Sequence, residues 1–422
     1  MLAARRASIA ATSSVASSTR RSFASATVDG VQLAALDSKT QIASLAFVVK
    51  AGSRYAAAPG VAHALERFAF QNTKTRSALR VTREAEFLGA SLTPSLSRDA
   101  IVLEADFLKE DLPYFFEVLA DSFARPHLAR HELAEVVAPL LKFDSSAAAA
   151  DAAVSAVEAL HLAAYRRGLG LPLYAQPVDS ISAKTVAEYK DLVYTKANLA
   201  IVGAGVSLDQ LKPLVADFLE DAVAGTASAV PASSFFAGDV RVSSTAGSAL
   251  ALGHASPYAP ELAVLAALLG GVPSIKWSYG SSLLATATQG KAVASLSNYA
   301  GSSLFKIVVN ADSAAETSAA TKAAAAALKS VASSGVSSED LKKAIAQAKF
   351  SAVAALEGKP GLTATGLSLL TAGTIPDIAS SVSAIGSVSA DKVKAAAEAI
   401  VKKIAVGAVG KVSELPYADE LF

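Results

Sequence analysis

The chain carries two partial copies of one pattern, and this duplication limits the folds available to it more than any other feature. Residues 101–106 read IVLEAD, which is typical of a buried strand that ends in polar side chains. Residues 307–312 read IVVNAD and follow about 206 positions later. A helix-forming stretch comes after each copy.

Two further pairs of segments repeat at nearly the same spacing. A helical stretch ends in Lys-Phe at residues 142–143, and another does so at residues 349–350. Residues 181–186 (ISAKTV) resemble residues 388–393 (VSADKV), and a helix and then a strand follow each. Three matches in one order predict a tandem duplication of a unit of about 200 residues, a normal domain size.

Each unit reads as strands and helices that do not strictly alternate, which favours an α+β fold over a doubly wound sheet. The first strand is expected at residues 42–50, and a helix is expected after Pro59-Gly60. A stretch rich in Ala, Gly, Ser and Thr, with Pro231, separates the copies and is typical of a linker. The predicted segments are a first domain at 29–221, a linker at 222–235 and a second domain at 236–422.

The first 28 residues have the composition of an organelle-targeting leader. They contain four arginines and many Ser and Ala residues, and no acidic residue occurs before Asp29. This pattern is typical of a mitochondrial transit peptide, whereas a secretory signal would need an unbroken apolar core. Residues 21–25 (RSFAS) resemble a matrix cleavage site. Chloroplast import and a disordered tail are the alternatives, and residues 1–28 are expected to lie outside the fold.

Charge and composition exclude several classes of function. The net charge is +1, from 38 Lys and Arg against 37 Asp and Glu, which gives no general attraction to nucleic acid. The absence of cysteine excludes disulfides, thiolate catalysis and cysteine zinc sites. We find no unbroken apolar run of roughly 20 residues and therefore predict no transmembrane helix.

The segment HALER at residues 63–67 carries the chemical information in this chain. In an inverted zinc motif, H-x-x-E-H, two histidines on one helix face bind zinc and the glutamate activates the metal's water. His63 and Glu66 match this motif, but Arg67 stands at the second histidine position. A guanidinium is permanently cationic and cannot coordinate zinc.

The stretch from Phe47 to Thr73 resembles the pitrilysin-like metallopeptidases, which use this motif and are built from two similar halves. The resemblance implies a mostly antiparallel sheet packed against helices in each domain. It also implies a third zinc ligand, a glutamate, roughly 75 residues after the motif. No glutamate lies between Val136 and Ala150. His63, Glu66 and Arg67 are therefore expected to be a degenerate remnant, with no catalytic residue, no metal and no cofactor.

The chain more closely resembles the core subunit 2 family of the mitochondrial cytochrome bc1 complex. This complex is respiratory complex III, or ubiquinol–cytochrome c reductase. The matching segments include EVVAPLLKFD, NLAIVGAGVS and GGVPSIKWSYGSSLLA. Lys276-Trp277 belongs to this match. The resemblance implies a non-catalytic subunit on the matrix side of the inner membrane that supports assembly. Its implied partners are core subunit 1, cytochrome b, cytochrome c1 and the Rieske protein, in a dimeric complex. The alternative is the presequence-binding alpha subunit of the mitochondrial processing peptidase.

Other histidines and glycines give weaker signals. His127 and His131 lie four apart, near Glu132 and Glu135, but the polar surroundings favour a helix start at the surface over a metal site. Gly270-Gly271 lacks the G-x-x-x-x-G-K-[ST] arrangement of a phosphate loop, so a turn is expected there.

Overall fold

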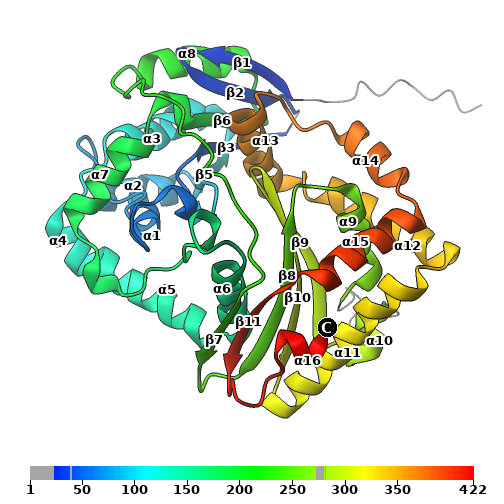
Figure 1. Ribbon diagram of the computed structural model, residues 1–422. Helices are drawn as coiled ribbons and strands as arrows, with labels where there is room; N and C mark the ends of the chain where they lie inside the picture. Colours follow the sequence, from blue (N-terminus) through cyan, green and yellow to red (C-terminus); the bar gives the residue numbers. More distant parts are fainter. Residues whose placement is uncertain (1–22, 39, 272–279, 281) are drawn as a thin grey trace, which may run out of the picture.

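The computed structural model describes residues 23–38, 40–271, 280 and 282–422, and its framework is two mixed β-sheets (Figure 1). The first sheet has the strand order β1-β2-β6-β3-β5-β4. Its strands are β1 (Ala24–Val28), β2 (Val31–Leu36), β3 (Ile42–Val49), β4 (Ser91–Leu96), β5 (Ile101–Leu108) and β6 (Leu199–Ala204). The pair β2–β6 is parallel and every other neighbouring pair is antiparallel.

The second sheet repeats this topology. Its strand order is β7-β11-β8-β10-β9, with one parallel pair, β7–β11, at the position that corresponds to β2–β6. The strands are β7 (Asp239–Ser243), β8 (Ser248–Ser256), β9 (Ala292–Tyr299), β10 (Ser302–Ala311) and β11 (Ala405–Gly410). The two IVxxAD segments lie in β5 and β10, which are equivalent strands. The predicted α+β class, with mostly antiparallel sheets, is confirmed.

Helices cover the outer face of each sheet, and several begin where the sequence provides a capping side chain. In the repeated ISAKTV and VSADKV segments, Ser182 and Ser389 accept backbone N–H bonds at the starts of α7 and α15. Helices of the first half are α1 (Val61–Arg67), α2 (Ala78–Phe87), α3 (Leu112–Ala124), α4 (Arg130–Glu132), α5 (Ala138–Ala150), α6 (Ala152–Tyr165), α7 (Ala183–Val193) and α8 (Leu208–Phe218). A π-helical turn, Leu133–Val137, joins α4 to α5.

The second half has its own set of helices on the other sheet. These are α9 (Pro260–Leu269), α10 (Leu283–Thr288), α11 (Ala314–Ser334), α12 (Ser338–Ala354), α13 (Gly358–Ala372), α14 (Ile378–Gly386), α15 (Ala390–Lys402) and α16 (Ala418–Leu421). Ser337 caps α12 by accepting a hydrogen bond from the Asp340 N–H.

The two halves exchange one helix each, and this joins them more tightly than the linker does (Figure 1). Helix α6, from the first half, packs on β8 and β11 of the second sheet. Helix α13, from the second half, packs on β3 and β6 of the first sheet. Small residues allow this approach: a side chain at Gly407 of β11 would clash with the backbone of α6, and one at Gly366 of α13 would meet Val48 at 2.6 Å. Each sheet is therefore covered on both faces.

The structure corrects two expectations near the start of the chain. Residues 24–28 form β1, paired with β2, so the expectation that the whole range 1–28 lies outside the fold is wrong at its C-terminal end. Two strands also precede the one that was expected to be first. The stretch between the halves lacks helix and strand, but it is held in place: Ser228 bonds Asn198, and Arg54 bonds the Pro231 carbonyl. The segment with Lys276-Trp277 lies outside the described residues.

Within the part of the chain that the structure describes, no single helix is long and apolar enough to cross a membrane. Two consecutive helical segments, Arg130–Ala150 and Ala152–Tyr165, reach that length and composition only when they are taken together, and the chain bends sharply between them.

Candidate functional site: the remnant of a metal centre

Helix α1 places the HALER segment in the interior of the first half. The helix begins after Gly60, whose φ of 80° suits glycine and whose missing side chain leaves room for Ala175. His63 and Glu66 are both buried, with relative exposures of 3% and 4%. Arg67, at the last position of the helix, is partly exposed.

The hydrogen bonds of His63 fix its tautomer. The backbone N–H of Ala175 donates to Nδ1 at 3.2 Å, so Nδ1 is the acceptor nitrogen. Nε2 therefore carries the proton and donates it to Oδ2 of Asp144, 3.1 Å away. Burial lowers the pKa of His63, although the bond to Asp144 opposes this effect. A neutral imidazole with both nitrogens engaged has no free lone pair for a metal.

Asp144 lies on α5, and one of its carboxylate oxygens accepts hydrogen bonds from two side chains, those of His63 and Arg67. Arg67 Nε donates to the same Oδ2 at 2.7 Å, and it lies 3.4 Å from Glu66 Oε2. No glutamate lies on this stretch, as the sequence shows, but the aspartate Asp144 places a carboxylate next to His63.

Glu66 has the most strongly shifted pKa in this cluster. Burial raises its pKa to about 7, and the nearby Arg67 opposes the shift. The glutamate thus stands at the boundary between its charged and neutral forms near neutral pH.

The residues present do not fit a zinc ion. A zinc site needs at least three N, O or S donors around one point, and this cluster offers His63 and Asp144 with a guanidinium against them. No group of three or more His, Cys, Asp or Glu side chains in the described ranges is arranged to hold a metal. The positive charge that a metal would bring is supplied by Arg67.

A small hollow adjoins this cluster and is lined by both halves. Tyr174 lies edge-on to the His63 ring, with 5.5 Å between ring centroids, and it borders a cavity of about 250 Å³. Val240 and Val242 of β7 line its far side, and Glu158 of α6 lines another wall. Glu158 is already engaged, since it accepts from Arg98 and from the Leu173 N–H. The Glu158 carboxylate is therefore not free to act as a general acid or base in this cavity.

The other candidate histidines do not form a site. The carboxylate of Glu132 is buried and accepts the backbone N–H groups of Asn72 and Ala129, so it closes the start of α4. His127 uses its own backbone N–H to bond the Asn72 carbonyl. The expectation of a helix start is confirmed.

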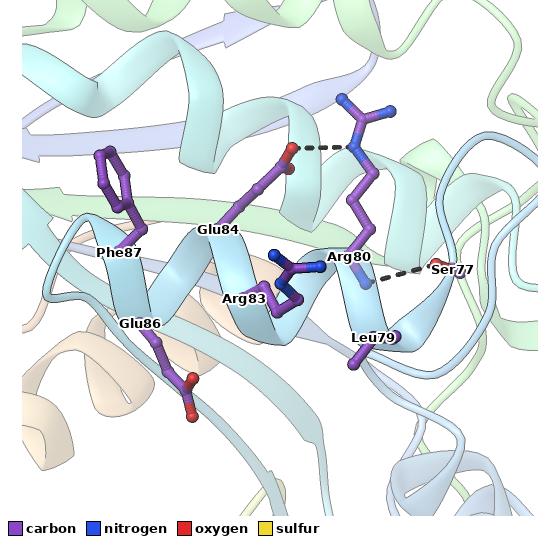
Figure 2. A pocket seen from close by; sticks show the side chains of 7 residues that line it. All are labelled: Ser77, Leu79, Arg80, Arg83, Glu84, Glu86 and Phe87. Carbon is purple, nitrogen blue, oxygen red and sulfur yellow. Dashed lines mark hydrogen bonds and ion pairs between the residues drawn. The ribbon is translucent and has the colours of Figure 1, made fainter.

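A larger, open hollow of about 750 Å³ runs along α2 and is lined by that helix alone, with Leu79 and Phe87 exposed and Arg80 paired to Glu84 (Figure 2).

Comparisons with known protein families agree with the fold of the two halves. Residues 32–176 match the model of the insulinase family, peptidase family M16, and residues 180–348 match that of the M16 inactive domain. The fold and these matches define the class: the chain is built from the two domain types of M16 peptidases.

Relatives over nearly the full length narrow this class. The chain is 40% identical to the mitochondrial cytochrome b-c1 complex subunit 2 of Neurospora crassa, over 96% of this chain and 92% of that protein. It is 38% identical to the protein of that name from Yarrowia lipolytica (95% and 97% covered) and 35% identical to that from Cryptococcus neoformans (98% and 97%). The chain therefore belongs to the family of mitochondrial cytochrome b-c1 complex subunit 2 proteins.

Proposed function

We propose that this chain serves as core subunit 2 of the mitochondrial cytochrome b-c1 complex, respiratory complex III, and contributes no active site of its own. The main observation behind the lack of an active site is the Arg67–Asp144 ion pair. The fixed cation of Arg67 stands at the position where the zinc motif requires its second histidine. Full-length similarity to subunit 2 proteins supports the same function. The subunit acts through packing surfaces that support assembly and stability of the complex.

The finer parts of this proposal concern place and partners. The chain sits at the matrix side of the inner membrane as a peripheral subunit, and it pairs with core subunit 1. Cytochrome b, cytochrome c1 and the Rieske protein complete its neighbourhood within a dimeric complex. The proposed leader delivers it to the mitochondrion. The names of its relatives favour this function over that of a presequence-binding subunit of the processing peptidase.

The decisive experiment is affinity purification of the tagged chain from gently solubilised mitochondria, with identification of stoichiometric partners. Co-purification of cytochrome b, cytochrome c1 and the Rieske protein is the expected result. Recovery instead with one soluble partner that has an intact H-x-x-E-H motif would overturn the proposal. A parallel test replaces His63 by Ala at normal protein level, and respiration should be unchanged.

A further inference from the structure

The turn between β9 and β10 belongs to the second half but ends inside the first. It is a tight turn around Gly301, whose φ is 78°. Its residue Ala300 is held by both of its backbone groups. The Ala300 N–H donates to Oδ2 of Asp99 at 3.0 Å, and the Ala300 carbonyl accepts from Nη1 of Arg54 at 3.1 Å.

Arg54 and Asp99 form a buried ion pair that lies between these backbone groups. Arg54 Nη1 is 2.6 Å from Asp99 Oδ1, and the two residues are 3% and 5% exposed. The other end of the guanidinium, Nη2, donates to the Pro231 carbonyl at 2.9 Å and to Ser233 Oγ at 3.0 Å. One arginine of the first half thus holds the connecting segment and a turn of the second half at once.

The residues on either side of Ala300 are fixed by the exchanged helix α6. His161 Nδ1 faces the Val157 carbonyl at 2.7 Å and must donate to it, so Nε2 accepts from the Tyr299 hydroxyl at 2.7 Å. Tyr165 and Ser302 share a hydroxyl–hydroxyl bond of 3.0 Å. All these groups are buried or nearly so, and hydrogen bonds in such a setting have strong directional requirements.

We propose that the Arg54–Asp99 pair and the β9–β10 turn form an interdomain latch that locks the two halves at a single angle. The exchanged helices α6 and α13 already join the two sheets, and the latch adds a further contact that fixes the angle between them. The latch makes the pair of halves one rigid body. This inference concerns the free chain and does not depend on the function proposed above.

The natural absence of cysteine provides a direct test. We would introduce Thr82→Cys on α2 and Ser330→Cys on α11, two exposed helix positions in different halves, and attach spin labels. Pulsed electron–electron distance measurements on the full chain should give one narrow distribution. Adding Asp99→Asn should broaden that distribution at least about twofold, since removing one partner of a buried pair is strongly disruptive.

Two further variants keep the test decisive. Arg80→Met breaks an exposed ion pair on α2 and is the matched control, so its distribution should stay narrow. Tyr299→Phe removes one hydroxyl and keeps the ring, and it should also broaden the distance distribution. This variant serves as the test if the Asp99→Asn protein does not fold. A broad distribution in the unaltered chain would overturn the proposal, and so would a narrow one in a folded latch variant.

Discussion

Arg67 and His63 both donate to one oxygen of Asp144, and together they fill the place in which a metal ion would be held. The arginine carries a permanent charge on a planar group that suits a carboxylate. The cluster keeps its shape because a cation is still present, although that cation is now part of the chain.

We predict that Arg67→His converts this cluster into a zinc site. The new histidine would lie four positions after His63 on the same helix face, and Asp144 would supply the third ligand. Zinc binding through Nε2 requires the His63 proton to move to Nδ1, so the ring must give up the hydrogen bond that it accepts from the Ala175 N–H. Measurement by isothermal titration should show one zinc ion bound per chain.

The control for this prediction is Arg67→Gln, which removes the charge and adds no metal ligand. It should bind no zinc and should lose some stability, because Asp144 is left without its closest cation. A folded Arg67→His protein that binds no more zinc than Arg67→Gln would contradict the prediction.

Glu66 gives the chain a specific dependence on pH. Its pKa in the folded chain is raised to about 7 from 4.5, so the folded state holds the proton more tightly than the unfolded state does. The stabilisation from this group is complete below about pH 4.5 and is lost as the pH rises to about 7. Glu66→Gln should therefore stabilise the chain at pH 8 by on the order of 2 kcal/mol, with little effect at pH 5.

Urea denaturation at the two pH values measures this difference. Glu86→Gln, at an exposed position on α2, is the matched control and should change the free energy of unfolding by less than about 0.5 kcal/mol at both. If Glu66→Gln lowers stability at pH 8, attraction to Arg67 outweighs burial and the sign of our argument is wrong.

At the scale of elements, the exchanged helices α6 and α13 are the main feature that sequence patterns left hidden. The alanine-rich face of α6 would suit any core, and nothing in its composition says which sheet it covers. The duplication, the strands IVLEAD and IVVNAD and the capping serines were predictable, because they depend on local periodicity and capping chemistry. The partner of a helix depends on contacts far away in the sequence.

Gly407 provides a test of how closely α6 packs on β11. A Cβ atom there would clash with the backbone oxygen of Ala156, which cannot move without shifting the helix. Gly407→Ala should lower the free energy of unfolding by about 2 kcal/mol or more. Thermal or denaturant unfolding, followed by circular dichroism, measures the change.

Gly386→Ala is the matched substitution for this prediction. Its Cβ would meet only the flexible end of the Lys349 side chain, so its effect should be within about 1 kcal/mol of zero. Equal effects at Gly407 and Gly386 would show that α6 does not pack as closely as we describe.

At the scale of the whole molecule, the first strand decides where a leader can end. Residues of β1 pair with β2 over their full length, and Phe23 packs beside Ala34 and Val48. Removal of all residues before Asp29 would expose the edge of β2. We predict that the mature chain in mitochondria starts no later than Ala24, as N-terminal sequencing can establish. A mature chain that starts at Asp29 would contradict this expectation.

The cluster around His63 shows how far sequence reasoning reaches. His63, Glu66 and Arg67 could be predicted as one set because they align with positions one, four and five of a single helical motif. The contact of Asp144 with His63 and Arg67 could not be predicted, because it depends on the packing of α5 against α1. The latch around Arg54 and Asp99 has no motif at all, since its members come from three distant segments.

The helix exchange also sets the order in which the protein can mature. A chain delivered N-terminus first presents the strands of its first sheet, residues 24–204, well before residues 358–372 of α13 arrive to cover them. Until then the sheet face with Ala46, Val48 and Val202 has no cover, and an uncovered apolar face invites association with other chains. The first sheet therefore gains its full cover only after nearly all of the polypeptide has emerged.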